Sequence, residues 1–122
     1  MRLTILLAAA TLCHGEVSCP ASIRVGDKVE AAFLRISVLN QNPGGPEYDL
    51  APSSTDKAKN GDLTQVWKLA DYRDMNIVLR CRYRGTESVR NIDLPASLQA
   101  CTFKFRLDAK GNFLGTSQVT CR

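Results

Sequence analysis

Histidine is almost missing from this chain of 122 residues: the single one, His14, lies in a segment that the mature protein is expected to lose. A chain without histidine cannot form a Ser-His-Asp triad, a Cys-His nucleophilic pair or a histidine-ligated zinc site. No pair of carboxylates stands out either, because Asp71 and Asp74 are typical of solvated turn residues. The sequence therefore predicts a protein that is not an enzyme and that holds no metal ion or cofactor.

Long apolar runs are also missing, apart from residues 3–12 near the start. This run follows the basic pair Met1-Arg2 and leads to small residues ending at Gly15. A transmembrane helix needs roughly 20 apolar residues, so the pattern is that of a secretory signal peptide; a buried N-terminal helix is the alternative. We expect residues 1–15 to be a signal peptide and residues 16–122 to form one exported domain, free of the membrane after cleavage.

The excess of positive over negative charge is small. Loss of Arg2 leaves 15 basic residues against 12 acidic ones, a net charge of about +3. A mildly basic balance in an exported protein argues against a nucleic acid as the partner.

Cleavage of the signal peptide leaves four cysteines: Cys19, Cys81, Cys101 and Cys121. An even number in a small exported domain indicates two disulfides, and four cysteines allow three pairings. Cys101 and Cys121 are equally far from Gly111, so a hairpin that turns there sets them opposite each other. We therefore predict the bonds Cys101–Cys121 and Cys19–Cys81, although a register shifted by two residues would separate the first pair of sulfur atoms.

Residues 77–84 alternate between two kinds of side chain, which is typical of a half-buried strand. One face is apolar and includes Cys81; the other consists of Arg80, Arg82 and Arg84. Two interpretations of the arginines stay open. They form the solvated face of a sheet, or they belong to a basic binding surface, which Lys104 and Arg106 extend if the two strands pair.

Similar alternation recurs along the mature chain, with turn residues about every 8–12 positions and no convincing helix. Residues 32–38 are predicted to place their even-numbered side chains inward, and residues 101–107 their odd-numbered ones. Residues 40–47 and 53–62 are rich in Gly, Pro, Asn, Ser or Lys and are predicted to be surface loops. The fold class that follows is all-β, a small antiparallel β-sandwich or barrel with two disulfides.

Several short motifs occur in a defined order along the mature chain. They are Cys19-Pro20, Leu50-Ala51-Pro52, Trp67-Lys68-Leu69, Cys81 to Thr86, Leu94-Pro95, Cys101 and Cys121-Arg122. In this order the chain resembles a family of small exported proteins of Gram-negative bacteria, known mostly as uncharacterised periplasmic proteins. The resemblance covers most of the mature chain, but residues 42–46 are shorter and less apolar than the corresponding linker of the family. It implies localisation in the periplasm.

The chain is also similar in kind to type VI secretion immunity proteins, which act against toxins that attack the cell wall, and more weakly to periplasmic lysozyme inhibitors. The resemblance implies a protein partner, a wall-targeting toxin or another peptidoglycan-active enzyme, that is bound and blocked. Loops on a rigid scaffold commonly carry binding. The predicted contact residues are Asn42, Pro43, Gly44, Gly45, Pro46, Glu47, Arg80, Arg82 and Arg84. The alternatives are a structural or accessory envelope protein and a carrier of a small ligand in a barrel cavity.

Overall fold

The computed structural model describes residues 17–27, 29–42 and 44–122, so the predicted signal peptide and Pro43 lie outside it. The described residues form nine strands and one 3-10 helix. These are β1 (Ser22–Val25), β2 (Val29–Gln41), β3 (Glu47–Asp49), β4 (Ser54–Lys57), β5 (Leu63–Lys68), η1 (Leu69–Tyr72), β6 (Ile77–Tyr83), β7 (Val89–Asp93), β8 (Ala100–Leu107) and β9 (Phe113–Cys121). No helix of the described residues has the length and apolar character that crossing a bilayer requires.

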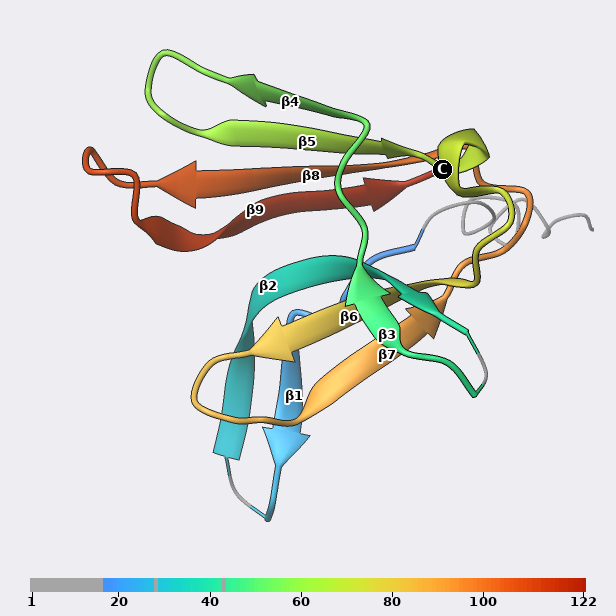
Figure 1. The fold of residues 1–122 in the computed structure, drawn as a ribbon. Coiled ribbons are helices and arrows are strands. Elements are labelled where there is room, and N and C mark those ends of the chain that lie inside the picture. The colour runs from blue at the N-terminus through green and yellow to red at the C-terminus, as the bar shows by residue number, and fades with distance from the viewer. Residues whose placement is uncertain (1–16, 28, 43) are drawn as a thin grey trace, which may run out of the picture.

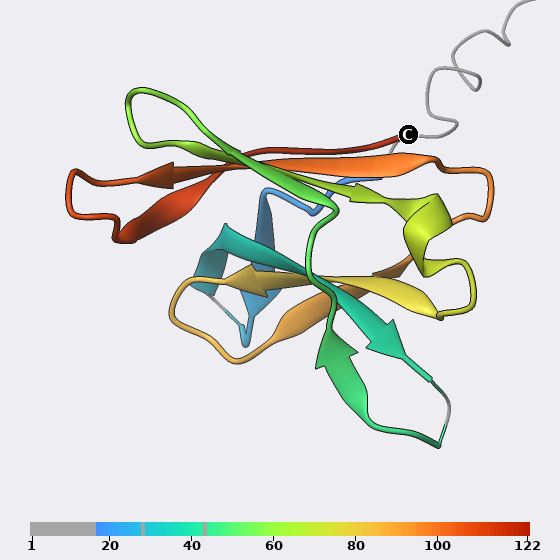
Figure 2. The same cartoon turned by 45° about the horizontal axis from the view of Figure 1, so that its top comes forward.

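The strands pair into two antiparallel sheets that are stacked face to face (Figures 1 and 2). Sheet 1 has the order β1-β2-β6-β7, and β3 joins the edge of β2 that β1 uses, at the other end of that long strand. Sheet 2 has the order β4-β5-β8-β9. The chain passes from sheet 2 to sheet 1 through η1 and returns through residues 94–99. The predicted antiparallel sandwich is thereby confirmed.

Apolar side chains from alternate strand positions fill the space between the sheets. Trp67 on β5 packs against Phe103 on β8, with 4.9 Å between the ring centroids. Its indole N–H donates to the carbonyl oxygen of Leu50 at 2.9 Å, so the buried polar atom has a partner. Sheet 1 contributes Ile36, Val38 and Leu79 to the same core. The predicted odd-numbered inner face of β8 is correct.

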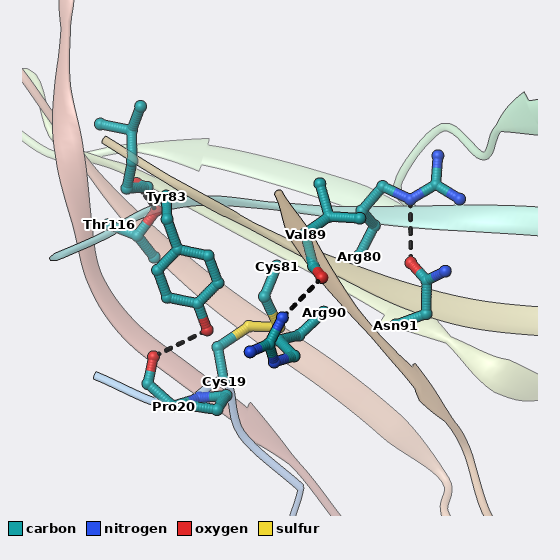
Figure 3. The surroundings of a disulfide bond; sticks show 10 residues. Cys19, Pro20, Arg80, Cys81, Tyr83, Val89, Arg90, Asn91 and Thr116 are labelled. Carbon is teal, nitrogen blue, oxygen red and sulfur yellow. Dashed lines mark hydrogen bonds between the residues drawn. A yellow bond between two sulfur atoms is a disulfide. The ribbon is translucent and has the colours of Figure 1, made fainter. Parts of the chain in front are cut away.

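The Cys19–Cys81 disulfide is present and ties the segment before β1 to the centre of sheet 1 (Figure 3). Near the same place the hydroxyl of Tyr83 donates to the carbonyl oxygen of Pro20 at 2.9 Å. Burial of Tyr83 raises the pKa of its hydroxyl, which stays a hydrogen-bond donor at neutral pH. The N-terminal segment is therefore fixed to β6 by one covalent bond and one hydrogen bond.

The Cys101–Cys121 disulfide is also present. The register of β8 against β9 that brings the two cysteines together differs from the simple hairpin that the sequence predicted. The turn is centred one residue earlier than Gly111, because Leu107 pairs with Phe113. Two register shifts along the ladder each place one extra residue in β9 and so restore Cys101 opposite Cys121. Each shift exchanges the two faces of a strand, and an even number of shifts returns the cysteines to the inner face.

β2 exchanges its faces once, at a bulge. Its register against β6 shifts just after Phe33, which leaves Leu34 as an extra residue. Ala31 is buried before the bulge and Ile36 after it, whereas Ala32 is exposed. The prediction of one even-numbered inner face along residues 32–38 is therefore wrong at its start, because a single bulge inverts the alternation.

Candidate partner-binding surfaces

A hairpin extends from sheet 1 where β2 ends and β3 begins (Figure 2). Gln41 and Glu47 face each other across it. The turn between them contains Asn42, Gly44, Gly45 and Pro46, all exposed. Gly44 has φ 75°, a left-handed conformation that favours glycine. The structure thus places four of the predicted contact residues in one exposed turn, while Glu47 begins β3 and Pro43 lies outside the described residues.

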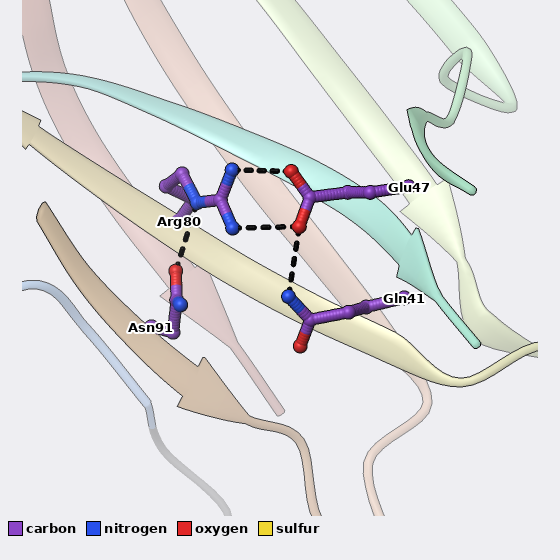
Figure 4. Close-up of polar contacts among 4 residues, drawn as sticks. All are labelled: Gln41, Glu47, Arg80 and Asn91. Atoms are coloured by element: carbon purple, nitrogen blue, oxygen red, sulfur yellow. Dashed lines mark hydrogen bonds and ion pairs between the residues drawn. The ribbon is translucent and has the colours of Figure 1, made fainter. Parts of the chain in front are cut away.

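An arginine from β6 holds the base of this hairpin (Figure 4). The two terminal nitrogens of Arg80 donate to the two carboxylate oxygens of Glu47 at 2.5 and 2.8 Å. Arg80 Nε donates to Asn91 Oδ1 of β7 at 2.9 Å, and Gln41 Nε2 donates to Glu47 Oε2 at 2.8 Å. This Arg80 network connects β2, β3, β6 and β7 on the outer face of sheet 1.

The network also changes the electrostatics and the burial of that face. Hydrogen bonds from Arg80 and then Gln41 lower the pKa of Glu47, and the same carboxylate raises the pKa of Arg80. The Arg80 side chain is only 15% exposed. Leu39 and Val78 are cross-strand partners, 1% exposed each, in the row between Arg80 and Gln41. The ion pair therefore crosses over two apolar side chains and shields them from water.

Arg80 and Arg82 of β6 and Arg84, which follows this strand, do not form the single solvated row that the alternation suggests. Arg80 belongs to the network, whereas the Arg82 side chain is exposed and has no hydrogen bond or ion pair within the described residues. Arg84 donates from Nη2 to the carbonyl oxygen of Leu114 on β9 at 2.9 Å. The predicted extension onto Lys104 is wrong, because β6 lies in sheet 1 and β8 lies in sheet 2.

The second predicted loop, residues 53–62, is partly a strand. Ser54–Lys57 form β4, the edge of sheet 2, and pair with β5. The remaining residues make a turn in which Gly61 has φ 96°. The polar composition hid this strand, because an edge strand with both faces exposed shows no apolar alternation.

A groove of about 800 Å³ opens at the same end of the sandwich as the hairpin. It lies between two of the connections that pass from sheet to sheet, η1 with the residues after it and residues 94–99. Asn76 lines the groove and is bonded to Gln41 at the base of the hairpin, through Asn76 Nδ2 and the Gln41 carbonyl oxygen at 2.6 Å. Sequence reasoning missed the groove; Tyr72 and Met75, apolar residues within an otherwise polar connection, were the available sign of it.

Comparison with known proteins identifies the family of the chain. Residues 28–122 match the family model described as type VI secretion system Tli immunity protein. The chain belongs to this family. An Azospirillum brasilense protein described as "Uncharacterized 16.3 kDa protein in trpG 5'region" is 27% identical over 143 aligned positions, which cover 100% of this chain and 95% of the relative. No solved structure matches the chain.

The family match confirms the resemblance to type VI secretion immunity proteins. It extends over strands β2 to β9 and includes Cys81, Cys101 and Cys121, while Cys19 precedes it. An immunity protein family implies a toxin as the binding partner. We therefore treat the candidate surfaces of the molecule as contact sites for a protein partner.

Proposed function

We propose that residues 16–122 act in the periplasm as an immunity protein that binds a type VI secretion toxin and blocks it by occlusion. The family match carries this proposal. The two disulfides support it, because such bonds persist in oxidising compartments such as the periplasm. The protein acts by binding, and no catalytic step is part of the proposal.

We place the toxin contact on the β2–β3 hairpin. The Arg80 network fixes the base of the hairpin, so that binding orders few additional groups and loses little conformational entropy. Tyr48 of β3 is 47% exposed, and its hydroxyl accepts a hydrogen bond from buried Asn40 Nδ2 at 2.8 Å. A tyrosine held in this way is a typical anchor of a protein interface.

The test begins with secreted proteins encoded next to this gene, each taken as a candidate toxin. Cells that lack both genes receive the toxin with a periplasmic signal and are expected to swell or lyse. Residues 16–122 exported to the periplasm should rescue them and should co-purify with the toxin, whereas the same residues kept in the cytoplasm should not rescue. If no neighbouring secreted protein is toxic and no toxin co-purifies, the immunity function is wrong and an accessory envelope role replaces it.

Two variants examine the hairpin within this assay. Tyr48→Ser should weaken toxin binding by tenfold or more, because truncation of an anchor residue commonly costs above about 1 kcal/mol. Val29→Ser is the matched control, since Val29 is 60% exposed but lies at the other end of β2. An equal loss of toxin binding in the two variants, or no loss in either, would exclude the hairpin from the interface.

The wall-active class of toxin stays a prediction from the sequence, and the same cells test it. Release of soluble peptidoglycan fragments from intoxicated cells would support that class. Release of fatty acids from membrane lipids without wall fragments would contradict it, while leaving the immunity function intact.

A further inference from the structure

A second group of arginines gathers where the bulge of β2 meets β9. The guanidinium carbon of Arg35 lies 4.5 Å from the centroid of the Phe113 ring. Arg84 reaches the same stretch of β9 through its hydrogen bond to the Leu114 carbonyl oxygen. Arg82 is the cross-strand partner of Arg35. We call Arg35, Arg82 and Arg84 the basic corner.

The seam between the two sheets fixes this corner. Thr116 Oγ1 donates to the carbonyl oxygen of the bulge residue Leu34 at 2.9 Å, which holds β9 against β2. Arg84 lies directly over Gly115 of β9, where a Cβ would make an ordinary van der Waals contact with Arg84 Nη2 at 3.6 Å. The corner is thus a product of the bulge, which brings residues of both sheets to one edge of the sandwich.

The positive charges of the corner are not neutralised within the described residues, where both ion pairs lie elsewhere. Like charges directly opposite each other destabilise a sheet, and Arg35 and Arg82 form such a pair. Two of the three guanidinium groups are oriented by neutral groups, an aromatic ring and a carbonyl oxygen. These contacts restrict the side chains without cancelling their charge.

We propose that the basic corner binds an acidic segment of the toxin, whose carboxylates accept hydrogen bonds from Arg82 and from the free N–H groups of Arg35 and Arg84. This proposal rests on the proposed function. Carboxylates match the planar guanidinium donors and remove the repulsion between the arginines. Leu114, 45% exposed beside Arg84, offers an apolar contact at the same place.

The corner and the hairpin can contact the same toxin molecule. From Arg35 to Gln41, β2 advances roughly 20 Å at about 3.3 Å per residue. A standard interface of about 800 Å² per partner spans roughly 30 Å. One toxin surface of ordinary size is therefore long enough to reach from the hairpin turn to the corner.

The experiment measures association of the neighbouring toxin with residues 16–122 at about 50 and 300 mM salt. The test variants are Arg82→Glu and Arg82→Glu/Arg84→Glu, and the matched control is Lys57→Glu/Lys104→Glu, two exposed cations of sheet 2. Each test variant should lower the association rate at low salt, the double variant by tenfold or more, and should reduce its salt dependence. The control should change the rate by less than about threefold.

The outcomes separate the two proposals. A wild-type protein that binds no toxin refutes the proposed function, whereas wild-type binding with unchanged rates in Arg82→Glu refutes the corner. The single variant Arg82→Glu makes the test of the corner conclusive, because the Arg82 side chain has no partner in the described fold. Reversal of its charge should therefore leave the unfolding midpoint unchanged. Sedimentation of the free protein with vesicles of anionic phospholipid, abolished in the test variants, would assign the corner to a membrane surface and overturn the toxin assignment.

Discussion

The outer faces of the two sheets differ, although the central strands behind them have the same pattern. β6 and β8 both alternate buried apolar residues with cationic ones. On sheet 1 the Arg80–Glu47 ion pair crosses over the nearly inaccessible Leu39 and Val78. On sheet 2, Lys104 and Arg106 of β8 are exposed to solvent. β6 therefore acquires a structured outer face because the acidic strand β3 pairs with its neighbour β2 and brings Glu47 within reach of Arg80.

This difference bears on binding. The structured face of sheet 1 presents a hairpin in a fixed position and leads along β6 to the basic corner. The face of sheet 2 is an ordinary solvated face, which favours solubility. We therefore expect substitution of Arg80 on sheet 1 to affect stability and toxin binding together, substitution of Arg82 to affect binding alone, and substitution of Lys104 on sheet 2 to affect neither.

The largest expected effects on stability concern the disulfides. Cys19–Cys81 closes a separation of 62 residues and Cys101–Cys121 one of 20. In the chain-entropy model these loops stabilise the fold by about 4 and about 3 kcal/mol. Replacing Cys19 and Cys81 by Ser should therefore lower the unfolding free energy more than the same change at Cys101 and Cys121, measured by urea titration without reductant. A greater loss from the second pair would show that sheet 2 depends more on its cross-link.

Smaller effects on the unfolding free energy are expected from substitution of Arg80 and of Lys104. Arg80→Ala removes three hydrogen bonds and uncovers Leu39 and Val78, so it should lower the unfolding free energy by about 1–2 kcal/mol. Lys104→Ala on sheet 2 is the control and should stay within about 0.5 kcal/mol of the wild type. Equal values from denaturant titration would mean that the network contributes nothing beyond an ordinary surface ion pair.

The smallest effect is a pH dependence. The pKa of Glu47 is lowered by its bonds from Arg80 and Gln41, and the pKa of Asp108, in the β8–β9 turn, by its bonds from Asn112. A lowered pKa in the folded state gives a contribution to stability that is complete above the unfolded value and is lost as the pH falls through the folded one. The destabilisation in Glu47→Gln should therefore be full at pH 7 and shrink below about pH 4.5, its ordinary value.

The corresponding variant of sheet 2 provides the comparison. The destabilisation in Asp108→Asn should shrink only below about pH 3.8, the ordinary value of that carboxyl. Unfolding midpoints in urea between pH 7 and pH 3 measure both variants against the wild type. A deficit in Glu47→Gln that is the same at pH 3 as at pH 7 would mean that the carboxylate charge has no part in holding the hairpin.

Much of the fold could be predicted from the sequence because it depends on local signals. Period-2 alternation identified β6 and β8, and the even cysteine count indicated two disulfides. The ordered motifs gave the resemblance to a family of small periplasmic proteins, and the general character of the chain gave its similarity to immunity proteins. The predicted disulfide at Cys101 was correct although the turn was placed one residue too late, because the two extra residues in β9 together offset that error. The bulge at Leu34 and the edge strand β4 escaped prediction, since neither leaves a simple trace in the alternation.

The candidate surfaces depended on tertiary structure. By itself the sequence determined which residues can face the core and that Arg80, Arg82 and Arg84 share the opposite face. It did not determine their neighbours, because Glu47 is 33 residues from Arg80 and Leu114 is 30 residues from Arg84. Only the tertiary structure decided which arginine is neutralised and which remain free. It did so through the pairing of β2 with both β3 and β6, and through the bulge that brings β9 to the edge of sheet 1. The reason is physical: alternation is a property of one strand, whereas the partner of a charge is set by the strands beside it.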